Sequence, residues 1–238
     1  MSILNSRDSV YTMGKIPEIP FAPESQKIPD FEIISLESLF VRGRENLLDH
    51  PLFGPQQIQF NLIIFITKGH GVHMIDFEQY SFADGHILCV ANRQVQAFDE
   101  QGKYEGFLIL FTNSFLLTDS KLPFLLPRHG FNFQLGTPSL ALSKADCTRF
   151  EHLAQELMME YHRVHDEGTW SLLQSHLNIV LLRLKREMAT GLPQSRSKSA
   201  ARFYEFQELL FDHVHQNRSA LFYAEQLTMS YKQLNTIC

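Results

Sequence analysis

Two pairs of histidines carry the side chains best able to hold a metal ion. His70 and His73 flank a glycine in a stretch with strand character, and His162 and His165 lie in a helical stretch beside Asp166. A metal site needs several such ligands to converge on one point. Residues three apart on a strand point to opposite faces, and histidines on a polar helix face are ordinarily solvated. Neither pair is expected to bind metal, and no cofactor is predicted.

Signatures of the common catalytic and nucleotide-binding sites are missing. The sequence has no Gly-x-Ser-x-Gly elbow and no P-loop, and the "GHG" at 69–71 lacks the third glycine and the following helix of a dinucleotide fingerprint. Cys89, Cys147 and Cys238 are too few and too scattered for a thiolate metal site or a disulfide framework. We predict a protein of a reducing cytoplasm that is not an enzyme.

The end of the chain, "YAEQLTMSYKQLNTIC" from Tyr223, has the pattern of one helix, a tight turn and the start of a second helix. Ser230 can accept from the free amides of the following turn, so it marks a helix start. Ala224 is small where two helices must cross closely, and Leu227 and Leu234 supply apolar contacts between them. The spacing predicts a helix-turn-helix unit.

Composition sets limits on the elements that position these groups. The chain has 238 residues, 44% of them hydrophobic, and a net charge of −5, so it can bury a core but has no overall attraction to phosphate. Residues 196–238 hold five basic and four acidic side chains, a mildly favourable balance for DNA. No apolar run is long enough to cross a bilayer, and no membrane partner is expected.

The N-terminal half predicts an all-β unit behind an extended arm. Four prolines fall between positions 17 and 29, so residues 1–30 are expected to form an arm. Short apolar or alternating runs from "FEIISLESLF" to "EGFLILFTNSFLL" predict strands. Ile63 and Phe65 make one face of a strand apolar, while the opposite face is apolar through its alternate residues, Ile58, Phe60, Leu62, Ile64 and Ile66. A strand covered on both sides belongs inside a sandwich or barrel.

After position 138 the apolar period changes to that of helices. Ser143 is the expected N-cap of the first amphipathic helix, and "TWSLLQSHLNIVLLRLKREMA" predicts a second. The second helix carries a stripe that would serve as a homodimer contact or pack on its own barrel, formed by Leu173, Leu177, Val180 and Leu184. We take 31–190 as one domain, 191–201 as a linker with hinge composition, and 202–238 as the start of a helical domain.

The tail pattern of Ala224, an apolar residue, Ser230 and Leu234 resembles the first helix-turn-helix of the AraC/XylS family of transcriptional regulators. The order of parts is similar too, because that family joins a cupin-like effector-binding barrel to dimerisation helices, a linker and a DNA-binding domain. The stretch "IIFITKGHGVHMIDFEQYSFADGHILCVANRQVQAF" looks like the family's barrel strands. The resemblance implies an α+β chain, a cupin-like β-barrel or jelly roll followed by helices and an incomplete all-α domain.

On this resemblance, the exposed face of the second tail helix would contact an operator. Lys232, Asn235 and Thr236 would read bases in the major groove, and Ser230 or Tyr231 would contact phosphate. The family has a second helix-turn-helix that does not occur in these residues. The sequence therefore predicts a longer natural protein, and weak operator binding or none by these 238 residues alone.

The barrel would bind a small-molecule effector. Candidate lining residues are Phe60, Leu62, Ile64, Phe98 and Phe107, and candidate polar anchors are Lys68, Arg93 and Gln96. A basic anchor facing the cavity would favour an anionic effector. The alternative is ordinary core for the phenylalanines and solvent for Lys68 and Arg93, and a register error of one residue would reverse every face.

Two other functions compete with an effector-responsive regulator. The first is a metal-dependent cupin enzyme, an isomerase or dioxygenase. Its usual ligand pattern fails here, since Gln57, Gln59 and Gln96 stand where histidines would be expected. The second is a dimerisation module that binds neither ligand nor DNA, which a barrel filled with side chains would favour.

Overall fold

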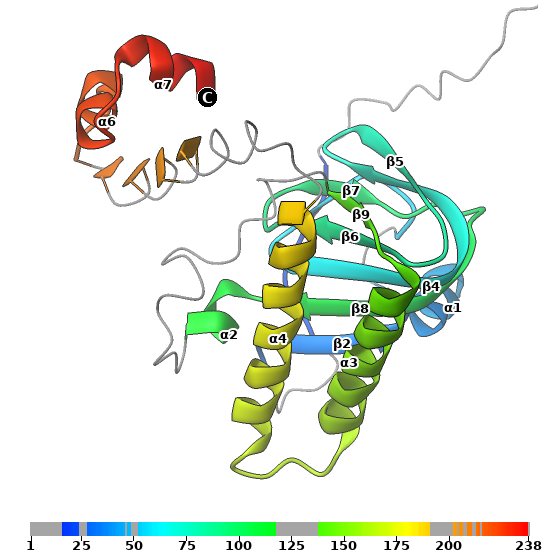
Figure 1. Ribbon diagram of the computed structural model, residues 1–238. Helices are drawn as coiled ribbons and strands as arrows, with labels where there is room; N and C mark the ends of the chain where they lie inside the picture. Colours follow the sequence, from blue (N-terminus) through cyan, green and yellow to red (C-terminus); the bar gives the residue numbers. More distant parts are fainter. Residues whose placement is uncertain are drawn as a thin grey trace, which may run out of the picture.

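The computed structural model describes residues 16–23, 28–45, 47–48, 52–117, 138–190, 202–203, 205–206, 209–210, 213–214 and 216–237. The chain has an α+β architecture, in which a curled, open sheet is followed by helices (Figure 1). The α+β class predicted from the sequence is confirmed. None of the helices within the described residues is long and apolar enough to cross a membrane.

The sheet is organised around one long strand, β4 (Asn61–Ile75). The first part of β4 pairs with β6 (His86–Val90) and β8 (Lys103–Phe111), and its end pairs with β5 (Glu78–Phe82) and β7 (Val95–Ala97). Three edges extend this arrangement: β2 (Phe31–Ser35) on β8, β3 (Gln56–Ile58) on β7, and β9 (Ser139–Ala141) on β6. Because one strand takes part in both halves, the sheet curls around an interior.

The two faces of β4 are both apolar, as its sequence predicted. Ile63 and Phe65 belong to the core under the helices, whereas Leu62, Ile64 and Ile66 belong to the core inside the curl. A β-bulge between Ile66 and Lys68 then shifts the pairing with β8. Beyond the bulge the odd-numbered positions face inward, since a bulge adds one residue to one strand.

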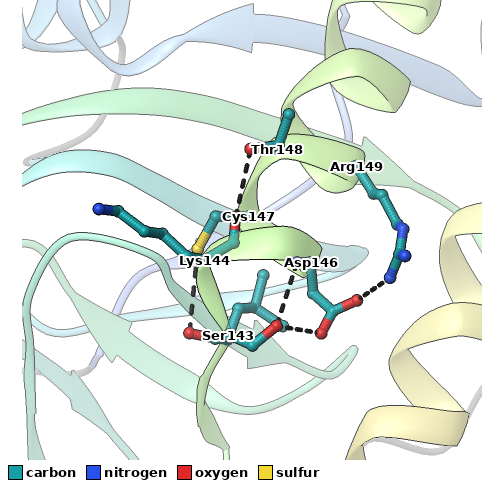
Figure 2. Close-up of polar contacts among 7 residues, drawn as sticks. Ser143, Lys144, Asp146, Cys147, Thr148 and Arg149 are labelled. Carbon is teal, nitrogen blue, oxygen red and sulfur yellow. Dashed lines mark hydrogen bonds and ion pairs between the residues drawn. The ribbon is translucent and has the colours of Figure 1, made fainter.

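Two helices cover the outer face of the sheet, α3 (Lys144–His162) and α4 (Thr169–Thr190) (Figure 1). The predicted cap at the start of α3 is confirmed, because the Asp146 amide donates to Ser143 Oγ at 3.2 Å. Figure 2 shows that the Asp146 carboxylate also accepts from the Ser143 hydroxyl and from Arg149, at 2.7 Å for the latter. These bonds hold the pKa of Asp146 below its usual value, led by the serine bond.

Leu173, Leu177, Val180 and Leu184 of α4 are 0–2% exposed and pack into the core beneath the helices. The expected dimer contact through these four side chains is therefore wrong, and the alternative, packing on their own sheet, is what the structure has. The sheet supplies the facing apolar surface, through residues such as Ile87 and Ile109.

Three elements differ from the sequence prediction. Positions 36–44, expected as strand, form helix α1 (Leu36–Arg44), because Ser35 accepts from the Ser38 amide and caps it. The strand predicted through position 117 ends at Phe111, and α2 (Asn113–Leu117) follows. Of the predicted arm the structure describes residues 16–23 and 28–30, and β1 (Glu18–Ile19) in it joins the sheet by parallel pairing with β3. The predicted linker at 191–201 lies outside the described residues.

The C-terminal residues form a small core of their own. Helices α6 (Ala220–Gln226) and α7 (Tyr231–Ile237) pack through Tyr223, Ala224, Leu227 and Leu234, all at most 8% exposed. Residues 202–203, 205–206 and 209–210 are also helical, and Phe206 and Leu210 pack against this core. The apolar contacts predicted for the tail are confirmed.

Candidate functional site

A cavity of about 230 Å³ lies inside the curled sheet. Its wall is mainly apolar because the inward faces of six strands (β1, β2, β3, β4, β7 and β8) and of α1 meet there. The residues that line it are Ile19, Pro20, Phe21, Ala22, Glu32, Ile34, Leu39, Arg42, Leu47, Leu48, Leu52, Gln56, Ile58, Phe60, Leu62, Gln96, Phe98, Leu108 and Leu110. An apolar cavity with a few polar groups is the usual form of a small-molecule site.

The N-terminal arm forms part of the cavity wall. Ile19 is buried, and its carbonyl accepts from the Gln59 amide at 2.9 Å. The ring of Phe21 packs edge to face on Phe60, with centroids 5.6 Å apart. The arm is thus held by backbone pairing and by one aromatic contact at the cavity itself.

Two glutamines supply polar atoms to the wall. Gln56 of β3 and Gln96 of β7 are direct partners across the antiparallel pair, and they are 1% and 2% exposed. The Gln56 amide donates from Nε2 to the Leu52 carbonyl at 3.4 Å. Among the described residues, Oε1 of each glutamine lacks a hydrogen-bond partner. The wall therefore presents two neighbouring acceptors.

The interior beside the cavity holds a buried histidine. His73 is 1% exposed, its ring lies edge to face with Phe98 at 4.9 Å, and burial lowers its pKa to about 3. Its Nε2 has no partner within the described part of the chain. Tyr104, also buried, has its pKa raised chiefly by burial. Both groups are neutral at physiological pH.

The structure places some of the predicted lining residues on the cavity. Phe60, Leu62, Gln96 and Phe98 all line it. Ile64 is 1% exposed on the same inner face but lies outside the lining. Alternation of inward and outward positions accounts for the agreement, because Phe60 and Leu62, like Gln96 and Phe98, are two residues apart on extended chain.

Three predicted pocket residues lie elsewhere. Lys68 points outward after the β-bulge, where its Nζ pairs with Glu105 at 3.2 Å and its side chain is 73% exposed. Arg93 is exposed in the turn between β6 and β7, at a φ of 71°. Phe107 packs into the core under the helices because Leu108, its neighbour in β8, takes the inward position. The basic anchors expected for an anionic effector are thus absent from the cavity lining.

Several lining residues escaped the sequence prediction. Gln56 stands among three glutamines, and only the β3 to β7 register separates the inward from the outward ones. Arg42 and Leu39 come from α1, which was expected to be a strand. A helix-capping pattern at Ser35 was the available signal, since its side chain can accept from the amide three residues on.

The described residues hold no group of three or more histidine, cysteine or acidic side chains that could bind a metal. His70 is exposed and His73 buried, as their spacing predicted. In the other pair, His165 contacts the Tyr161 carbonyl through Nε2 at 2.9 Å. Cys147, in the first turns of α3 (Figure 2), has its pKa raised, chiefly by burial, so it remains a protonated thiol and a poor nucleophile.

The α6 to α7 turn is fixed by backbone bonds at the end of α6 and by a side-chain cap at the start of α7. The amides of Thr228 and Met229 donate to the carbonyls of Glu225 and Ala224, at 3.0 and 2.9 Å, which closes α6 in a Schellman motif. Thr228 takes the left-handed position, at a φ of 51°. Ser230 Oγ then accepts from the Gln233 amide at 3.2 Å and begins α7.

Helix α7 has one buried and one exposed face. Leu234 is 2% exposed and lies in the core shared with α6. The residues predicted to contact DNA, Ser230, Tyr231, Lys232, Asn235 and Thr236, are all exposed. Thr236 Oγ1 also donates to the Lys232 carbonyl at 2.9 Å, within the helix. The arrangement leaves one cation, one amide and three hydroxyl-bearing side chains together on a solvent-facing surface.

No family model matches the chain, and no curated protein sequence is similar to it. Among solved structures, ToxT from Vibrio cholerae O395, bound to (E)-4-(8-methylnaphthalen-1-yl)but-3-enoic acid, is 8% identical with a TM-score of 0.39, over 87% of this chain and 75% of that one. The AraC-like transcriptional activator CuxR is 10% identical with a TM-score of 0.31, over 88% and 67%. Likeness at this level carries no functional conclusion, which must come from the chain's own residues.

Proposed function

We propose that the chain is an effector-responsive transcriptional regulator of AraC/XylS type, acting in the cytoplasm. The observation that carries the proposal is the α6 to α7 unit, in which Leu234 is buried and Lys232 and Asn235 are exposed on one short helix. The same chain contains a lined cavity inside a curled sheet. A regulator needs both a surface for DNA and a site for its signal.

The exposed side chains of α7 have the chemistry required for reading bases. A lysine donates to the acceptors of guanine, and an asparagine can both donate to and accept from adenine in the major groove. Tyr231 and Ser230, at the start of the helix, would contact phosphate, which fixes the orientation of the protein on DNA and does not read the sequence. Since the net charge of the whole chain is −5, binding would depend on this local surface.

Binding of a ligand in the cavity would act on the rest of the protein through the N-terminal arm. A ligand changes an equilibrium only if it binds one arrangement better than another. Phe21 contacts Phe60 at the cavity, so a ligand there would alter the contacts that hold the arm against β3. The arm is therefore the segment we assign to the switch.

We infer that the regulator is a homodimer that uses the outer face of α4. The side chains on the inner face of α4 pack in the core, but Leu172, Ile179 and Leu182 of the same helix are 45%, 41% and 37% exposed. Ile179→Asp should convert the dimer to a monomer in sedimentation without lowering the unfolding temperature. A chain that is monomeric before the substitution would contradict this part.

Selection of binding sites from a randomised duplex library tests the DNA function. Low salt strengthens weak DNA binding, so the wild-type chain should enrich a consensus under that condition, and the double variant Lys232→Ala with Asn235→Ala should not. Gln226→Ala, an exposed change on α6, is the matched control and should enrich the same consensus. Enrichment no greater than that of the double variant would refute the proposal.

A further inference from the structure

Two buried glutamines in the cavity wall carry side-chain oxygens to which no hydrogen-bond donor is bound within the described residues. Directly paired residues of neighbouring strands place their side chains on the same face, about 5 Å apart at Cβ. Gln56 and Gln96 are such a pair, and both line the cavity. A buried carbonyl oxygen without a donor destabilises the folded chain. A ligand that supplies the missing donor removes this cost, and the free energy recovered adds to its affinity.

The orientation of Gln56 is set by its own contact. Its Nε2 donates to the Leu52 carbonyl, which leaves Oε1 as the atom available to a ligand. The half-buried neighbour Gln57 lies outside the cavity lining, where its Nε2 donates to the Arg93 carbonyl at 2.9 Å. Among these glutamines, Gln56 and Gln96 are the ones whose buried, unpaired oxygens belong to residues of the cavity wall.

The charges on the lining do not favour an anion. Of the described lining residues, Arg42 is basic and Glu32 is acidic, and the others are uncharged. Glu32 is 6% exposed. A carboxylate entering this site would lose its hydration without an excess of positive charge to compensate, which is costly in an apolar interior.

We propose that the cavity binds an uncharged, largely apolar molecule whose hydroxyl or amide hydrogen is donated to Oε1 of Gln56 and Gln96. The apolar body packs against Phe21, Phe60 and Phe98. A cavity of about 230 Å³ takes a compact ligand, such as a phenyl-substituted alcohol. This inference rests on the proposed sensing function and names the class of its effector.

Three compounds of one shape separate the possibilities: phenylpropanol, phenylpropanoate and propylbenzene. Their dissociation constants for the wild-type chain are measured near neutral pH by calorimetry, with thermal shift as a second readout. Phenylpropanol should bind at least about tenfold more tightly than either of the others, because only it satisfies the acceptors without bringing a charge.

Variants assign the preference to the glutamines. Gln96→Leu should reduce the preference for the alcohol over propylbenzene to less than about threefold, since the acceptor is lost while the shape is kept. Gln57→Leu on the outer face is the matched control and should leave the preference unchanged. Gln56→Met gives a second test should Gln96→Leu fail to fold.

The outcomes distinguish this inference from the function on which it rests. Tightest binding of phenylpropanoate, or an alcohol preference that survives both inward variants, overturns the donor inference and leaves a sensing cavity in place. Failure of all three compounds to bind overturns the donor inference and removes the support for sensing as well.

Discussion

Ser230 and Gln233 cap the first turn of α7 reciprocally. The Gln233 amide donates to Ser230 Oγ at 3.2 Å, and the Ser230 amide donates to Gln233 Oε1 at 2.8 Å. Two amide donors at the helix start are thereby satisfied, in the arrangement known as a capping box. The start of the helix that we assign to DNA is therefore fixed by its own sequence.

Ser230→Ala should destabilise the C-terminal unit by about 1 kcal/mol, because an amide of the first turn loses its acceptor. Protection of the α7 amides against hydrogen exchange measures the loss. Ser219→Ala is a matched control, since Ser219 precedes α6 but makes no side-chain capping bond. An equal loss for the two alanine variants would contradict the capping role.

Thr228→Gly should stabilise the same unit by up to about 1 kcal/mol. Thr228 holds a φ of 51°, and only glycine adopts that region without steric cost. Gln226→Gly, in the last turn of α6, should instead destabilise by about 1 kcal/mol. Thermal unfolding of the two variants gives the comparison, and destabilisation by Thr228→Gly would show that the threonine side chain makes a contact that outweighs the strain.

The buried imidazole of His73 makes stability depend on pH. Its folded pKa of about 3 lies below the unfolded value of 6.5, so the unfolded chain takes up the proton first as the pH falls. The stability that neutral His73 contributes is fully present above the pKa of the unfolded chain and is lost progressively as the pH falls toward the pKa of the folded chain. The free energy of unfolding should therefore fall by about 2 kcal/mol between pH 7 and pH 5. Urea unfolding at these two values measures it.

His73→Leu should abolish this part of the pH dependence, and His70→Gln, at an exposed position of the same strand, should retain it. An unchanged slope in His73→Leu would mean that the pKa of His73 is the same in the folded and the unfolded chain.

The two sides of α4 should respond differently to truncation. Leu177→Ala removes a side chain that is 0% exposed and should lower the free energy of unfolding by about 2–5 kcal/mol. Leu172→Ala changes a side chain that is 45% exposed, and its effect on the monomer should stay within about 0.5 kcal/mol. Denaturant midpoints at low protein concentration compare the two, and equal losses would contradict the assignment of the faces.

Local patterns predicted much of this fold because their cause is local. The cap at Ser143, the start of α7 at Ser230 and the two apolar faces of β4 all follow from side chains near the backbone they act on. The β-bulge after Ile66 could not be inferred in the same way, because it arises from the pairing of β4 with β8. That single shift moved Lys68 from the expected cavity to the surface.

The cavity was the part least open to prediction. Its wall combines the arm, α1 and strands that are distant in the sequence, and Gln56 differs from its neighbour Gln57 only in the face that the register assigns. The stripe of α4 had two equally suitable partners, its own sheet and another subunit, and apolar spacing alone does not choose between them.

The central claim is that the exposed face of α7 reads DNA sequence, and the most direct measurement is a ratio of affinities. Fluorescence anisotropy gives the dissociation constants of the wild-type chain and of Asn235→Ala. Each protein is measured with the selected duplex and with a scrambled duplex of the same length, at one salt concentration. Wild-type chain should prefer the selected duplex, and Asn235→Ala should lose at least about fivefold of that preference. A wild-type ratio near one, or a ratio that Asn235→Ala leaves unchanged, would contradict the account.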